Sequence, residues 1–293
     1  MIIKPITETI KEIQEAIDQN DYKTAYQTVK ENVDLNKEHI EGEYVFKNLL
    51  EELLFQILIK KEIRNKIPLI LDYSTLYSNC GEIFLYRSDM DDAKKSFELS
   101  HNYNPINIKA NFGLGEIAKR EGNIEEFYKL TMESFKIAYY PEDLSKSFRN
   151  LSYYFLKIAD ENQDNEEKIK ENLKIAICLK NISEDYDDRS NLAEEELTEI
   201  NSRISKLNEK LPEAIKISTT EECRQFLKSK GLPYEAGIEV ITICKNLGFQ
   251  LDEAKKVVPA LYYFNIAYDL TKDENIKSVI DDLNKKVERR LNE

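Results

Sequence analysis

Tryptophan is absent from this chain of 293 residues, and only 8 glycines and 7 prolines occur. So few turn-forming residues argue against a β-sandwich or β-barrel, whose many short strands need frequent turns. Only two histidines are present, His39 and His101. The sequence also contains no phosphate-binding glycine loop, no HExxH pair and no nucleophile elbow. We therefore expect a protein that is not an enzyme and carries no cofactor.

Long apolar runs are also missing. The most apolar stretch, residues 49–59, contains two glutamates and a glutamine, and it is shorter than the ~20 apolar residues that a membrane helix needs. The first residues have neither the apolar core nor the cleavage site of a secretory signal. No two cysteines form a CxxC pair, which is typical of reduced, buried thiols: Cys80, Cys178, Cys223 and Cys244. These absences predict a cytoplasmic protein without membrane insertion.

The charge is strongly acidic, with 42 basic and 55 acidic residues and a net charge of −13. The field of such a chain repels phosphate backbones, so nucleic acid is not an expected partner. Hydrophobic residues nevertheless make up 41% of the chain. That share is enough for a substantial core, and a wholly disordered chain is excluded.

Apolar residues recur at helical spacing along almost the whole chain. Residues 6–39 predict two helices separated by Gln19–Asp21, a break so short that the pair must be antiparallel. Residues 41–64 predict one helix that is apolar on most of its sides, so we expect it to be buried core. The alternative is an exposed patch on 41–64 that would drive homodimerisation.

From Ser74 the pattern repeats every 34 residues. Residues 74–107 have Gly81, Ala93, Phe97 and Pro105 at positions 8, 20, 24 and 32, and residues 108–141 have Gly115 at position 8. This resembles the tetratricopeptide repeat (TPR) family, whose unit is a helix–turn–helix of 34 residues. Small residues at positions 8 and 20 let the two helices approach closely. The proline at position 32 ends the second helix.

The resemblance is weaker over residues 6–39, 143–182 and 241–274. In the last of these, Gly248 occupies position 8, and a rival interpretation makes it the left-handed cap that ends a helix. An acidic loop, a narrow apolar seam from Leu197 to Leu211, and a capping box at Thr219 and Glu222 interrupt the pattern. We predict a TPR-like array over 1–183, a charged helical insert or junction over 184–233, and a helix pair with a polar capping helix over 234–293.

The resemblance implies a right-handed superhelical solenoid of antiparallel helix pairs and a non-enzymatic adaptor or scaffold. In the family, a concave groove receives a peptide or a helix of a partner protein. Its groove positions imply a mixed set of polar, basic and aromatic residues here. Applied to this sequence, these are Asn79, Glu82, Tyr86, Lys109, Phe112, Glu116, Lys119, Arg120, Phe148, Arg149 and Phe155. The alternative is ordinary packing between repeats, with the basic side chains simply solvated.

Two competing functions follow from other residues. Asp160, Asn162, Asp164 and Glu171 occupy positions 1, 3, 5 and 12 of a calcium-binding loop. Asn165 replaces the usual glycine at position 6 of this loop, so an acidic solvated loop is the simpler interpretation. If residues 160–171 held a metal, the chain would be a ligand- or metal-responsive regulator. An enzyme of unrecognised type would need a polar pocket around His39 or His101.

Overall fold

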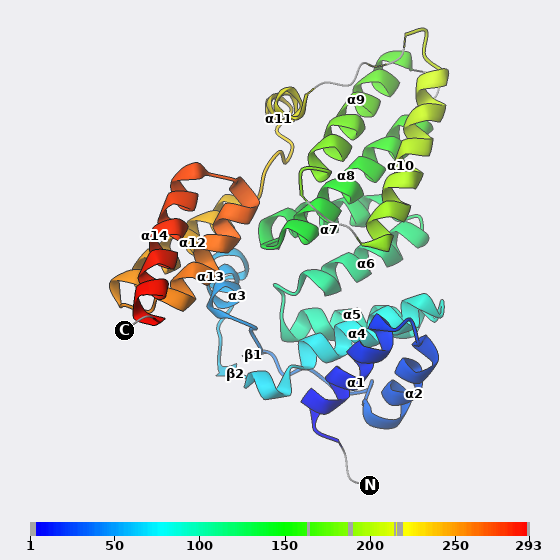
Figure 1. Cartoon of the computed structure of the whole chain (residues 1–293). Helices are drawn as coiled ribbons and strands as arrows, with labels where there is room; N and C mark the ends of the chain where they lie inside the picture. Colours follow the sequence, from blue (N-terminus) through cyan, green and yellow to red (C-terminus); the bar gives the residue numbers. More distant parts are fainter. Residues whose placement is uncertain (1–3, 163–164, 187–189, 214, 216–218, 292–293) are drawn as a thin grey trace. The chain divides into compact units, whose positions relative to one another are not determined.

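The structure, a computed structural model of the whole chain, describes all residues except 1–3, 163–164, 187–189, 214, 216–218 and 292–293. Fourteen α-helices make up most of this described part (Figure 1). The expectation of an all-α fold is therefore confirmed. The chain divides into two compact units, residues 1–130 and 131–293.

The first unit is built from helix pairs and one irregular segment between them. Consecutive helices pack on each other in the pairs α1–α2 and α4–α5, and α4 also packs on α1 and α6. The helices are α1 (Ile6–Asp18), α2 (Tyr22–Asn32), α3 (Leu49–Leu54), α4 (Tyr73–Tyr86), α5 (Met90–Tyr103), α6 (Ile108–Arg120) and α7 (Ile124–Ile137), which ends in the second unit.

The second unit repeats the pairing with longer helices. Helices α8 and α9 pack on each other, as do α12 and α13, and α10 and α11 each contact α9. Their bounds are α8 (Pro141–Glu161), α9 (Glu166–Ser183), α10 (Asn191–Glu209), α11 (Thr220–Ser229), α12 (Ile238–Glu253), α13 (Val257–Thr271) and α14 (Glu274–Leu291). The predicted C-terminal helix is therefore present as α14.

Three-residue turns of one geometry join four of the helix pairs. In each turn the third residue donates its N–H to the carbonyl of the residue five positions earlier, as Asp21 does to Ala16 at 2.8 Å. Such a hydrogen bond is typical of a helix that ends at a residue with a left-handed backbone. The left-handed middle residues are Asn20 (φ 56°), Ser88 (φ 63°), Gly122 (φ 74°) and Lys255 (φ 59°). The same turn therefore ends α1, α4, α6 and α12 and reverses the chain direction before the next helix begins.

A phenylalanine and two glycines set the close approach of α4, α5 and α6. Phe97 of α5 lies between Gly81 of α4 and Gly113 of α6. A Cβ on Gly81 would be 2.7 Å from the Phe97 ring, and one on Gly113 would be only 2.3 Å from it. Both distances are too short for any side chain. The small residue expected at position 8 of the first repeat therefore admits the aromatic ring of position 24.

The predicted single helix over residues 41–64 is wrong. Its described structure is a two-residue strand β1 (Glu43–Tyr44), the short helix α3 and a π-helical turn Phe55–Ile59 that ends at the left-handed Lys60. The strand β1 pairs in parallel with β2 (Asn65–Lys66), and a 3₁₀ turn follows at Leu69–Leu71. The segment is part core and part surface, because its apolar residues do not share one helical stripe.

Buried residues of α8, α9 and α10 form the core of the first half of the second unit. Leu156, Leu173, Ile200 and Leu207 belong to this cluster. The seam predicted on the charged helix therefore packs on neighbouring helices. The capping box of α11 is confirmed as well, since Thr219 and Glu222 bond each other's backbone N–H groups.

Gly248 lies inside α12, and the rival interpretation that it ends a helix is wrong. A Cβ on Gly248 would be 2.8 Å from the ring of Phe264 on α13. Gly248 therefore lets α12 and α13 pack closely, as Gly81 does for α4 and α5 beside Phe97. Pro259 falls in the first turn of α13, where its missing N–H breaks no helical hydrogen bond. No helix in the described ranges is long and apolar enough to cross a membrane.

Candidate functional site

Eight of the predicted groove residues lie on α4 and α6 in the first unit, and seven of them remain after the fully buried Asn79 is set aside. Three of them are cationic and two are carboxylates, and the rest are aromatic. We call this surface the α4–α6 face: Glu82, Tyr86, Lys109, Phe112, Glu116, Lys119 and Arg120. The two helices pack on each other, and Arg120 Nη1 donates to the carbonyl of Leu85 at 3.3 Å. This hydrogen bond joins the C-terminal ends of α4 and α6.

The charges on the α4–α6 face are partly neutralised within it. Glu116 forms ion pairs with Lys119 at 2.6 Å and with Arg120 at 2.9 Å. Burial raises the pKa of Glu116, but the attraction of the two cations is stronger and the pKa lies below its ordinary value. Lys109 is exposed and forms no ion pair with any described residue. The face therefore keeps one free ammonium beside a paired cluster.

An exposed aromatic platform borders the same face. Tyr86 is 65% exposed, and its ring stacks on Tyr22 of α2 with 3.7 Å between centroids and 9° between planes. Burial, followed by the charge of Glu82, raises the pKa of Tyr22. Stacking fixes the Tyr86 ring while one side of it stays open to solvent. A partner can therefore gain contact with the ring at little cost in side-chain entropy.

Three predicted groove residues lie in the cores of their units and offer no surface to a partner. Asn79 and Phe148 are fully buried, and Arg149 is 2% exposed. Asn79 Nδ2 donates to Gln14 of α1 at 3.4 Å, and Arg149 forms an ion pair with Glu196 of α10 at 2.6 Å. These partners come from helices whose positions the repeat pattern alone does not give.

Phe148 and Phe155 both belong to the second unit. The ring of Phe148 stacks on that of Tyr186, with 5.9 Å between centroids, and meets the ring of Phe135 of α7 edge-on at 4.8 Å. Phe155 is half-buried and packs against the core of α8, α9 and α10. Ordinary packing, the alternative given for these aromatics, describes both of them.

The three described residues of the predicted calcium loop have other partners. Asp160 pairs with Arg203 at 3.8 Å, Glu171 pairs with Lys230, and Asn162 donates to the carbonyl of Ile158 at 2.7 Å. The fourth, Asp164, lies outside the described residues. No group of three His, Cys, Asp or Glu side chains able to share a metal ion occurs where the structure is described.

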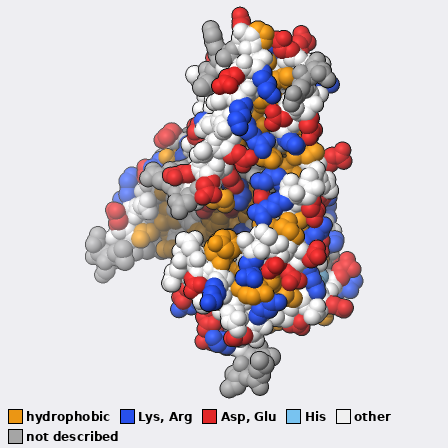
Figure 2. All heavy atoms as spheres, turned by 90° about the vertical axis from the view of Figure 1, so that its right-hand side faces the viewer, with side chains coloured by type: hydrophobic (Ala, Val, Ile, Leu, Met, Phe, Trp, Pro, Cys, Tyr) orange, Lys and Arg blue, Asp and Glu red, His pale blue; other side chains and the backbone are white. Residues whose placement is uncertain are grey.

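Apolar surface does occur in and beside residues 41–64, for which an exposed patch that drives dimerisation was the alternative to buried core. Leu49 and Ile57 are 45% and 44% exposed, and Leu69 and Ile70 are 53% and 64% exposed. On the face shown in Figure 2, hydrophobic side chains are interspersed with side chains of both charges. A homodimer through 41–64 stays a prediction.

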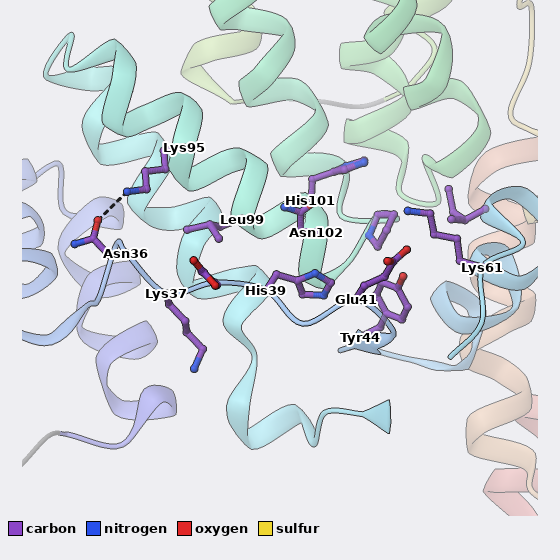
Figure 3. A pocket seen from close by; sticks show the side chains of 13 residues that line it. Asn36, Lys37, His39, Glu41, Tyr44, Lys61, Lys95, Leu99, His101 and Asn102 are labelled. Carbon is purple, nitrogen blue, oxygen red and sulfur yellow. Dashed lines mark hydrogen bonds between the residues drawn. The ribbon is translucent and has the colours of Figure 1, made fainter. Parts of the chain in front are cut away.

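Both histidines line one pocket in the first unit, which we call the histidine pocket (Figure 3). Its volume is about 980 Å³. His39 Nε2 donates to the carbonyl of Glu43 at 2.7 Å, and its ring packs edge-on against Tyr103. No sequence motif marks this pocket, because most of its residues come from a connecting segment and from α5. The polar pocket that an unrecognised enzyme would need is therefore present, and the absence of catalysis stays a prediction.

No protein-family model and no curated protein sequence matches the chain.

Proposed function

We propose that this chain is a helical-repeat protein of the TPR type that binds another protein without catalysing a reaction. The partner would present an extended segment with acidic residues, and that segment would lie across the α4–α6 face. The right-handed superhelix and the role as adaptor or scaffold belong to this proposal.

The recurring turn is the observation that carries the helical-repeat part. Ser88 and Gly122 are 34 residues apart, and Asn20 precedes Ser88 by 68 residues, which is twice that spacing. The three turns share their left-handed residue and their backbone hydrogen bonds. Identical local structure at a fixed spacing is what a chain of stacked helix–turn–helix units produces.

The chemistry of the α4–α6 face supports an acidic partner segment. Lys109 is exposed, and Arg120 is 43% exposed although it contacts Glu116. A partner carboxylate can therefore approach both cations from solvent. Tyr86 supplies an aromatic surface at the other edge of the face. Aromatic and arginine side chains are the residues that most often carry binding energy at protein interfaces.

Affinity capture with matched variants tests this function. The α4–α6 variant is Tyr86→Ala, Lys109→Glu, Arg120→Glu, and the control is Lys94→Glu, Lys129→Glu on α5 and α7. Both change the charge by the same amount, and all five side chains are exposed, so both variants should keep the wild-type helical content. We expect a partner that wild type and control retain and the α4–α6 variant loses.

Equal retention by all three proteins would contradict the assignment to this face. Capture of no partner by wild type would contradict the adaptor function itself. A captured protein should also release when a synthetic peptide of its own acidic segment is added, and failure of every such peptide would contradict the extended-segment mode.

A further inference from the structure

The histidine pocket concentrates cationic and hydrogen-bonding side chains within a strongly acidic chain. Its charged lining residues are three lysines and two glutamates, in addition to the two histidines: Lys37, Lys61, Lys95, Glu38 and Glu41. The walls also include apolar side chains of Leu99, Ile59 and Tyr44. A pocket with apolar walls and a few polar groups is typical of sites for small organic molecules.

The three lysines are not equivalent. Lys95 Nζ donates to Asn36 Oδ1 at 2.9 Å, and the Lys37 ammonium lies 4.2 Å from the centre of the Tyr73 ring. Figure 3 shows Lys37 pointing away from the other labelled side chains. Lys61 is exposed and has no ion pair or hydrogen bond from its ammonium to the described residues. It is therefore the cation most available to a ligand.

His101 lies beside Lys61 in this pocket. Burial lowers the pKa of His101, and the positive charges of Lys61 and Lys129 lower it further. Its Nδ1 is shielded from solvent and has no hydrogen-bond partner among the residues that the structure describes. Buried N–H groups without a partner are rarer than buried acceptors without one, so the proton belongs on Nε2. With this assignment, Nε2 is the nitrogen through which His101, a lining residue of the pocket, would donate to a ligand.

We propose that the histidine pocket binds a small organic phosphate ester, with its phosphate between Lys61 and His101 and its organic part along Leu99, Ile59 and Tyr44. The phosphate would receive hydrogen bonds from the ammonium and from the imidazole Nε2. Lysine binds phosphate as a point charge, and the cations among the described lining residues of this pocket are lysines, without an arginine. The site is separate from the α4–α6 face and does not depend on the partner proposed for it.

Proton NMR of the two histidine rings provides the test, because each ring gives one Hε1 signal and a His101→Gln variant assigns the two. The full-length chain is titrated with phenyl phosphate at neutral pH. We expect a saturable shift of the His101 signal. Lys61→Glu should weaken the affinity at least tenfold, because it replaces the attracting ammonium by a repelling carboxylate. Lys23→Glu, an equal charge change at the exposed start of α2, should leave the affinity unchanged.

The remaining outcomes of this titration each support or overturn the proposal. No saturable shift with phenyl phosphate would overturn it, as would equal weakening by Lys61→Glu and Lys23→Glu. Inorganic phosphate should shift the same signal with lower affinity, because it lacks the organic part. Benzoate binding as tightly as phenyl phosphate would overturn the assignment of phosphate. Loss of the α4–α6 partner has no bearing on any of these results.

Discussion

Replacing Gly113 by alanine should destabilise the first unit, although alanine is the better helix former. The new Cβ would lie 2.3 Å from the Phe97 ring, whereas ordinary contacts begin near 3.4 Å. The ring cannot move away by the missing ångström, because Gly81 of α4 lies close on its other side. Helices α4 and α6 would therefore have to separate.

The expected change in the free energy of unfolding is the sum of two opposing contributions. Overpacking a core costs up to about 3 kcal/mol, and replacing glycine by alanine within a helix returns about 1 kcal/mol. The net loss is about 2 kcal/mol for Gly113→Ala. Gly115→Ala on the same helix is the matched control. Its Cβ would lie 3.8 Å from Phe127, an ordinary contact, so this variant should gain up to about 1 kcal/mol.

Urea denaturation followed by circular dichroism measures both changes. Shortening the ring with Phe97→Leu should remove most of the cost of Gly113→Ala, because the clash is with the ring. A Gly113→Ala protein at least as stable as wild type would refute the packing described for α4, α5 and α6. Equal effects of the Gly113 and Gly115 substitutions would refute it as well.

The remaining predictions concern turns, a buried ion pair and pH. No atom of the described residues would lie within 4 Å of a Cβ at Gly122, so Gly122→Ala should cost about 1 kcal/mol through its left-handed backbone alone. Ser88→Gly should not destabilise the equivalent turn in urea titrations. Arg149→Met should cost about 3 kcal/mol because it leaves Glu196 unpaired beside the core, and adding Glu196→Leu should recover most of the loss in thermal unfolding. The lowered pKa of His101 means that the unfolded chain binds its proton at higher pH than the folded chain does. Stability should therefore fall as the pH drops below about 6.5, and His101→Gln should flatten the curve measured between neutral pH and about 5.5.

The helices and the hairpins with short turns could be predicted because their signals are local. The polar break Gln19–Asp21 and the capping box at Thr219 each concern neighbouring residues. The close approach of α4 and α5 at Gly81 was also predicted, because the small residue at position 8 and the helix it faces belong to one 34-residue window, whereas its contact with Phe97 came from the structure. In residues 41–64 the apolar residues do not follow one clear period, and the helix predicted from them was wrong. Two-residue strands and a π-helical turn have too few residues to show a period.

The burial of groove residues could not be predicted for a different reason. Phe148 and Arg149 occupy groove positions in the repeat pattern, but Tyr186 and Glu196 cover them. Both covering residues come from the segment that breaks the pattern, and its packing is set by tertiary contacts. The histidine pocket was missed likewise, because His39 and His101 are 62 positions apart and share no motif.

Site-specific photo-crosslinking tests the central claim most directly. A benzophenone amino acid is placed at Tyr86 or Lys109 on the α4–α6 face, and at Glu98 on the exposed side of α5 as the control. The account predicts that the first two positions crosslink one partner protein through an acidic segment, and that position 98 does not. Crosslinking of the same partner from position 98 alone would contradict the proposed binding face.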